Sequence, residues 1–152
     1  MRYSPSALNM FAQCPAKYKY EKLDHVQPIY VERAKADVGH DVHNAIQYYF
    51  SKVQEKPRRI ELTEGIKRAW DEIVGNKYKS NRILQHRVTQ SLKNFTEFEI
   101  MRRKTWKSYL PSMVEKPLQG KEFRGIVDFY SEKEQVVIDW KTGKKNELSL
   151  DD

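Results

Sequence analysis

The chain has 152 residues, of which 39% are hydrophobic, 12% aromatic and 32% charged, and this composition supports a folded core and excludes an intrinsically disordered chain. No apolar run reaches the ~20 residues that a membrane helix needs, and the start MRYSPSALNM lacks the apolar segment of a signal peptide, so we expect a cytoplasmic protein. With 28 Lys and Arg against 21 Asp and Glu, the net charge of +7 favours nucleic acid as a partner over a merely soluble basic protein.

The first predicted helix follows Ser4-Pro5-Ser6. Either serine can cap this helix, and Pro15 ends or interrupts it. Cys14 is the single cysteine of the chain, which excludes an internal disulfide and any all-cysteine zinc or iron–sulfur site within this chain. We expect Cys14 to be a buried, small apolar residue.

A basic and aromatic stretch comes next, in which Lys17, Lys19 and Lys22 alternate with Tyr18 and Tyr20. Cations mixed with aromatic rings suit a surface that binds nucleic acid. The alternative is a solvated helix face whose tyrosines pack inward, and the sequence leaves both interpretations open.

A longer helix is predicted from Asp37, which can cap it, after a loop at residues 25–35. His43 lies off its apolar stripe in an early turn, and His40 shares that side of the helix. The stripe that we expect to be buried contains Val42, Ala45, Ile46, Tyr49, Phe50 and Val53.

Two further helices follow, one at residues 63–74 with Gly75 as its stop, and one from the cap Asn81 to about Lys104. Their apolar faces contain Ile66, Ala69, Trp70 and Ile73 in the first, and Leu84, Val88, Leu92, Phe95 and Phe98 in the second. The cations Arg102, Arg103 and Lys104 at the end of the long helix offset its dipole, or they contact phosphates.

Three strands complete the prediction, at residues 112–119, 121–130 and 135–142. Alternation places Asp139 and Lys141 on one face, and Ile138 and Trp140 on the other. Asp128 sits near the end of the preceding strand. If these strands pair as a hairpin, two carboxylates and one ammonium converge at one sheet edge, where the carboxylates suit Mg²⁺ or Mn²⁺.

Asp128 followed by Asp139-Trp140-Lys141 resembles the PD-(D/E)XK nuclease motif. The fuller pattern GIVD…IDWKTGK most resembles the RecB-type branch, which includes CRISPR-associated RecB-like exonucleases and the nuclease domains of AddAB-type helicase–nucleases. The resemblance covers nearly the whole chain in order. It implies an α/β fold of the restriction-endonuclease-like type in a single domain over 1–152, with a helical part at about 1–108 and a mixed-sheet core at about 112–142.

The resemblance also implies a metal site. The spacing Gly39-x-x-x-His43 matches the motif in which RecB-type nucleases present a metal-binding histidine from a helix. His43, Asp128 and Asp139 would then hold Mg²⁺ or Mn²⁺, and the imidazole favours Mn²⁺. His40 is the alternative ligand.

Three more residues receive roles from the same resemblance. Lys141 would position the attacking water and stabilise the phosphorane, and the Trp140 carbonyl would be a further ligand. Glu115 would have a supporting or second-metal role, against the alternative of a solvent-facing glutamate. Lys144 joins the basic residues that we expect to contact nucleic acid.

The expected function is metal-dependent hydrolysis of DNA, as an exonuclease on single-stranded ends. The alternative is a non-catalytic nucleic-acid-binding or assembly module that retains the nuclease fold. RecB-type nucleases continue with a Gln-x-x-x-Tyr helix and a strand, and this chain stops at Asp152. We therefore expect a missing C-terminal helix and strand, and self-association or a protein partner at the open sheet edge.

Overall fold

The computed structural model describes residues 3–26, 33–55, 62–108 and 110–142. A helical part precedes a small sheet, as the α/β expectation requires. The elements are α1 (Pro5–Gln13), α2 (Pro15–Tyr18), the π-helical turn η1 (Lys19–Leu23), α3 (Arg33–Glu55), α4 (Leu62–Ala69), the π-helical turn η2 (Trp70–Val74), α5 (Arg82–Thr105), β1 (Met113–Gln119), β2 (Arg124–Ser131) and β3 (Val136–Ile138).

The N-terminal helices begin and end where their capping residues predict. The Ser4 side chain accepts a hydrogen bond from the backbone nitrogen of Ala7 and caps α1, which ends one residue before Cys14. The expectation that Cys14 is buried is wrong, because its side chain is exposed. Its sulfur instead accepts a hydrogen bond from the backbone nitrogen of Lys17 and caps α2.

Helix α3 contributes half of the buried residues of the hydrophobic core among the described residues. All six residues of its predicted stripe are at most 2% exposed. The helix begins at Arg33, however, so the expected loop at residues 25–35 ends earlier and Asp37 lies inside the helix instead of capping it. Aspartate is tolerated there because its side chain is exposed.

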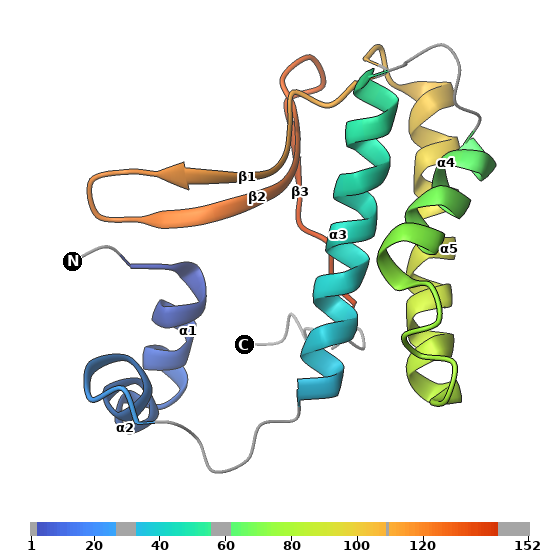
Figure 1. Cartoon of the computed structure of the whole chain (residues 1–152). Coiled ribbons are helices and arrows are strands. Elements are labelled where there is room, and N and C mark those ends of the chain that lie inside the picture. The colour runs from blue at the N-terminus through green and yellow to red at the C-terminus, as the bar shows by residue number, and fades with distance from the viewer. Residues whose placement is uncertain (1–2, 27–32, 56–61, 109, 143–152) are drawn as a thin grey trace, which may run out of the picture.

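Helices α4 and α5 pack against α3 (Figure 1). Gly75 has φ +49° at the end of η2, a conformation that favours glycine, and it terminates the helix as predicted. The Asn81 side chain accepts a hydrogen bond from the backbone nitrogen of Leu84 and caps α5. The predicted stripe of α5 faces the core, where Val88 is fully buried.

The basic end of α5 is partly buried, and this corrects one prediction. Arg102 is 1% exposed, and its guanidinium donates two hydrogen bonds of 2.7 Å to the buried carboxylate of Glu99. Arg103 is half-buried and pairs with the same carboxylate at 3.1 Å. Arg102 is therefore not accessible to a phosphate, and Arg103 is committed to a structural contact.

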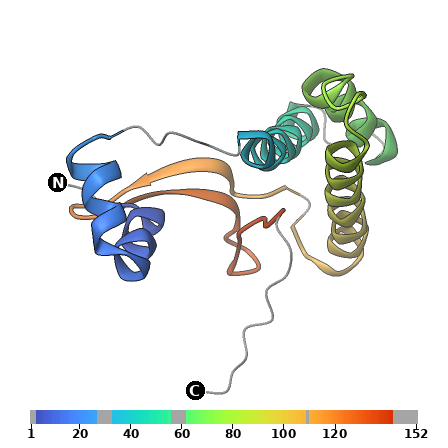
Figure 2. The same ribbon diagram turned by 90° about the horizontal axis from the view of Figure 1, so that it is seen from below.

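The three described strands form an antiparallel sheet in the order β1-β2-β3, rather than the mixed sheet that we expected. Figures 1 and 2 show that β1 and β2 form a long hairpin, which leaves the helices and reaches over α1. A single parallel bridge from Tyr3 to Phe123 joins the hairpin tip to the N-terminal segment. The strand β3 lies at a sheet edge, and pairing of that edge with another chain stays a prediction.

Aromatic rings connect the sheet to the helices. Trp140 packs against Phe98 with the ring centroids 5.2 Å apart, and against Phe95 at 5.7 Å. Phe129 of β2 is fully buried against Phe50 of α3 at 5.4 Å. These contacts fix the segment after β3 against α5, although β3 itself ends at Ile138.

None of the described helices is long and apolar enough to cross a membrane.

Candidate metal centre

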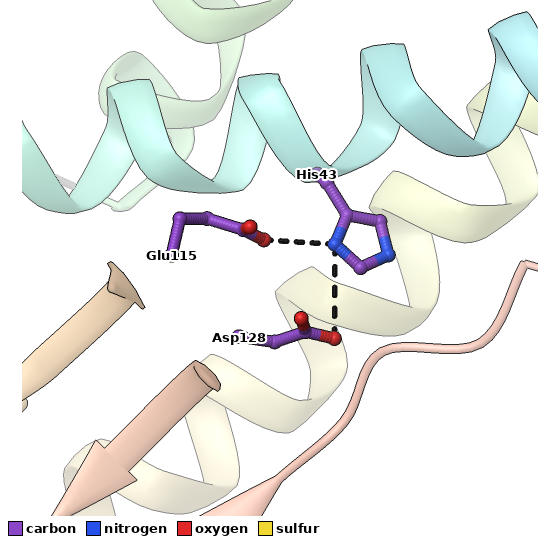
Figure 3. A group of neighbouring side chains, drawn as sticks. All are labelled: His43, Glu115 and Asp128. Atoms are coloured by element: carbon purple, nitrogen blue, oxygen red, sulfur yellow. Dashed lines mark hydrogen bonds and ion pairs between the residues drawn. The ribbon is translucent and has the colours of Figure 1, made fainter. Parts of the chain in front are cut away.

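Three side chains from three different elements converge where the hairpin meets α3 (Figure 3). They are His43 of α3, Glu115 of β1 and Asp128 of β2. The Nδ1 atom of His43 lies 2.8 Å from Oε1 of Glu115 and 3.7 Å from Oδ2 of Asp128. One donor atom from each residue lies within 4.8 Å of the other two, so this cluster can hold a single ion.

The position of Glu115 follows from the register of the hairpin. Val114 pairs with Phe129 and Lys116 pairs with Val127, so Glu115 stands opposite Asp128. The backbone of Glu115 has φ +46°, the left-handed region, and the ladder makes no pair at this position. A left-handed conformation costs a non-glycine residue roughly 1–2 kcal/mol. Such strain is typical of residues held in place for function.

Asp128 is buried, with 10% of its side chain exposed. The backbone N–H of Trp140 donates a hydrogen bond of 2.7 Å to its Oδ2 atom. A hydrogen bond to the charged form of a carboxylate compensates part of the cost of burying it. No sequence pattern predicts this contact, because it joins residues of two segments through a backbone atom.

The second ring nitrogen of His43 determines how the imidazole can act. Its Nε2 atom lies 3.1 Å from the carbonyl oxygen of Trp140, which can only accept a hydrogen bond. The contact between Nδ1 and Glu115 is a hydrogen bond in this structure, and an ion bound in the cluster would take the place of its proton, so that the lone pair of Nδ1 would face the ion. A histidine that donates one N–H to a backbone carbonyl and presents the other nitrogen to carboxylates has the surroundings of a metal ligand. The donor set thus fits a divalent ion.

The carbonyl of Trp140, predicted as a further ligand, therefore orients His43 in this structure. Asp139 and Lys141 lie outside the cluster. Their side chains are 60% and 81% exposed, and they form an ion pair of 2.6 Å with each other. They share a face, as alternation predicts, but that face is turned to solvent. The structure thus brings together only His43 and Asp128 of the three ligands that the sequence predicts, and the third member of the cluster is Glu115, for which a supporting or second-metal role is expected.

The other predicted nucleic-acid contacts lie on α2 and η1. Lys17, Lys19, Lys22 and Tyr20 are exposed, whereas Tyr18 is half-buried against Phe11 with ring centroids 5.4 Å apart. The alternative of inward-packed tyrosines therefore applies to Tyr18 and not to Tyr20. Lys144 lies outside the residues that the structure describes. His40 is exposed and is hydrogen-bonded to Asn44 at 3.0 Å, away from the cluster.

The sequence pattern of the PD-(D/E)XK nuclease superfamily matches residues 2–152. Because this match spans nearly the whole chain, the chain belongs to the PD-(D/E)XK nuclease superfamily. None of the curated proteins and none of the solved structures gives a significant match. Membership in this superfamily confirms the expected α/β fold class and implies a nucleic-acid substrate. His43, Glu115 and Asp128 form a candidate site for a divalent ion.

Proposed function

We propose that this protein is a metal-dependent nuclease that hydrolyses phosphodiester bonds in DNA. The observation that carries the proposal is the convergence of one imidazole and two carboxylates from α3, β1 and β2, in a chain that belongs to a nuclease superfamily. Buried carboxylates placed side by side are costly unless a cation or hydrogen bonds compensate them. A cation supplied from solution satisfies this requirement.

His43, Glu115 and Asp128 would hold the ion, which we propose is Mg²⁺ or Mn²⁺, since carboxylate oxygens suit both and imidazole favours Mn²⁺. When bound, such an ion lowers the pKa of a coordinated water and neutralises charge on the scissile phosphate. The Trp140 backbone orients both sides of the site, because its N–H binds Asp128 and its carbonyl binds His43.

Asp139 and Lys141 are the chain neighbours of Trp140, whose backbone contacts both Asp128 and His43. We propose that Lys141 leaves its partner Asp139 when a nucleic acid strand is bound, because an exposed ion pair contributes little stability and the ammonium can pair with a phosphate oxygen instead. Lys141 then stabilises charge that develops on the phosphate, and Asp139 is free to serve as an additional oxygen ligand. Both side chains are exposed enough to move without disturbing the core.

The resemblance to the RecB-type branch supports an exonuclease that acts on single-stranded ends. The net charge of +7 supports the same class of substrate, since the protein is attracted to a polyanion. The exposed lysines 17, 19 and 22 with Tyr20 add a second basic and aromatic surface.

The test is a nuclease assay on end-labelled single-stranded DNA with Mn²⁺ or Mg²⁺, and with EDTA as the metal-free control. We expect cleavage that requires metal and that is lost in His43→Ala and Asp128→Asn. The matched control is His40→Ala, which removes an exposed imidazole from the same helix and should retain activity. Full activity in EDTA, or equal loss in His40→Ala, would refute this assignment.

One observation favours a second candidate function. Asp139 and Lys141 are paired with each other outside the cluster, as they would be in a non-catalytic DNA-binding module that keeps the nuclease fold. The same assay decides between the two. Metal-dependent binding of DNA without any cleavage, by protein that is fully folded, would support the binding module.

A further inference from the structure

Lys141 lies between two hollowed regions of the surface. One hollow of about 560 Å³ is bounded by the start of α1 and by the β1–β2 hairpin, with Ser4, Asn9 and Ile126 among its lining residues. Two smaller hollows, of about 150 and 270 Å³, lie over α5 and share Asn94 and Lys141. A chain of nucleotides that crosses Lys141 therefore meets a recess on each side of it.

We propose that the face of α5 formed by the exposed His86, Gln90 and Asn94 and by the half-buried Arg87 is a binding site for the nucleotide next to the scissile phosphate of a single-stranded nucleic acid. The proposal rests on the proposed nuclease function, because Lys141 marks where that phosphate lies. It adds residues that the sequence analysis did not single out. It also gives the strand a path, from the hairpin hollow across Lys141 to α5.

The spacing along α5 places these side chains together. His86, Gln90 and Asn94 recur at every fourth residue and so share one face of the helix, and Arg87 lies beside His86. Together with Lys141 they line the hollow of about 270 Å³. No carboxylate pairs with Arg87 in the described part of the chain, so its guanidinium is available to a phosphate.

The amides of this face offer both kinds of hydrogen bond. The Nε2 atom of Gln90 donates to Oδ1 of Asn94 at 2.8 Å. This contact fixes the two side chains and leaves the Gln90 carbonyl as an acceptor and the Asn94 amide nitrogen as a donor. A sugar or the edge of a base can use both groups.

An aromatic floor adjoins the polar face. The hollow of about 150 Å³ is lined by Phe98 and Trp140, both half-buried, together with Asn94. Aromatic rings bind unpaired bases by stacking, and cations along the same groove follow the backbone. A helix face that is merely solvated would carry polar residues, but it would adjoin neither these aromatic rings nor Lys141.

The test is fluorescence anisotropy with the full chain in EDTA, using a length series of fluorescein-labelled oligothymidylates and oligouridylates. The double variant Arg87→Ala/Asn94→Ala should bind long oligonucleotides about tenfold more weakly than the parent, since it loses a phosphate contact and a hydrogen bond. Its log–log salt slope should fall by about 0.7, the value for one phosphate contact on a single strand. Lys67→Ala, which removes an exposed cation from α4, is the matched control and should change neither quantity.

Circular dichroism checks that the double variant keeps its helix content. If it does not, the single variant Arg87→Gln replaces it, and the same change in the log–log salt slope is expected. Equal affinities and salt slopes for the variant and the parent would overturn the inference.

Because EDTA prevents cleavage, binding is measured independently of activity, and the proposed nuclease function and the proposed α5 site can fail separately. A chain that binds through α5 but never cleaves refutes the nuclease function, whereas one that cleaves normally without Arg87 and Asn94 refutes the α5 site. Preference for oligothymidylate or oligouridylate identifies DNA or RNA as the strand that the site accepts.

Discussion

The backbone N–H of Trp140 donates a hydrogen bond of 2.7 Å to Oδ2 of Asp128. This contact joins the segment that carries Lys141 to the buried carboxylate of the cluster. The indole of Trp140 is held at the same time by Phe98, with ring centroids 5.2 Å apart. The hydrophobic core therefore determines where Lys141 lies relative to the cluster.

Lys141→Ala should reduce cleavage on the order of 10²–10³-fold, the usual effect of losing one preorganised electrostatic stabiliser. Metal binding should be retained, because the Lys141 ammonium is not a ligand and pairs only with Asp139 among the described residues. Single-turnover cleavage of labelled DNA and a parallel Mn²⁺ titration measure the two effects. Lys67→Ala, which removes an exposed cation from α4, is the control for charge, and unchanged turnover in Lys141→Ala would show that this lysine is not catalytic.

The strained backbone of Glu115 leads to a prediction about stability. Glu115→Ala and Glu115→Gly both remove the carboxylate, but only glycine adopts the observed φ of +46° without strain. We expect the glycine variant to be more stable than the alanine variant by about 1 kcal/mol, the reverse of the usual order within a strand. Urea unfolding of both metal-free variants measures the difference, and an alanine variant of equal or higher stability would contradict the strain.

The buried ion pair between Glu99 and Arg102 should be important for folding. Glu99→Gln leaves the guanidinium of Arg102 buried without its counter-charge, and loss of one partner of a buried pair costs about 3–5 kcal/mol. Glu97→Gln, at an exposed position on the same helix, should change the free energy of unfolding by less than about 0.5 kcal/mol. Chemical denaturation of both variants gives the comparison, and similar stabilities would show that the pair contributes little.

Alkaline pH should destabilise the protein through Tyr78. Burial, together with a hydrogen bond to Asp41, raises the pKa of Tyr78 to about 12. An unfolded tyrosine ionises near pH ~10, so above that pH the unfolded chain releases a proton that the folded chain keeps. The free energy of unfolding should therefore fall as the pH rises from ~10 to about 12.

The measurement for this prediction is urea unfolding at a series of alkaline pH values. Tyr78→Phe should make the fall shallower, because it removes one of the groups that are linked to folding. Some of the fall should persist, since burial also raises the pKa of Tyr49, and Asp41 raises the pKa of Lys77. An unchanged slope in Tyr78→Phe would contradict the role of this side chain.

The sequence predicts most of the helices because their limits and buried faces depend on local signals. Asn81 and Gly75 mark helix ends through capping and through a positive φ, and the stripe of α3 follows the helical period. The start of α3 at Arg33 has no such signal, so the sequence points to Asp37 as the cap. The prediction for Cys14 is wrong because a cysteine that caps a helix has the same sequence pattern as one that is buried.

The candidate site could be predicted only in part, because it depends on contacts between distant segments. Alternation shows that Asp139 and Lys141 share a face, but it does not show which way that face turns once β3 has ended. The left-handed φ of Glu115 has no sequence signal, since glutamate does not favour it. The alternative in which Arg102 contacts phosphates is wrong, and only the fold shows that Arg102 is buried together with Glu99.

The central claim is that His43, Glu115 and Asp128 together hold one divalent ion, and Mn²⁺ titration of the metal-free protein tests it most directly. Electron paramagnetic resonance of free Mn²⁺ gives the affinity and the number of sites without any need for activity. We predict one dominant site whose affinity falls in His43→Ala, Glu115→Gln and Asp128→Asn by more than the ~10–100-fold that loss of a merely orienting residue costs. His40→Ala should bind as the parent does. Equal Mn²⁺ binding by the parent and by the His43 and Asp128 variants would contradict the account.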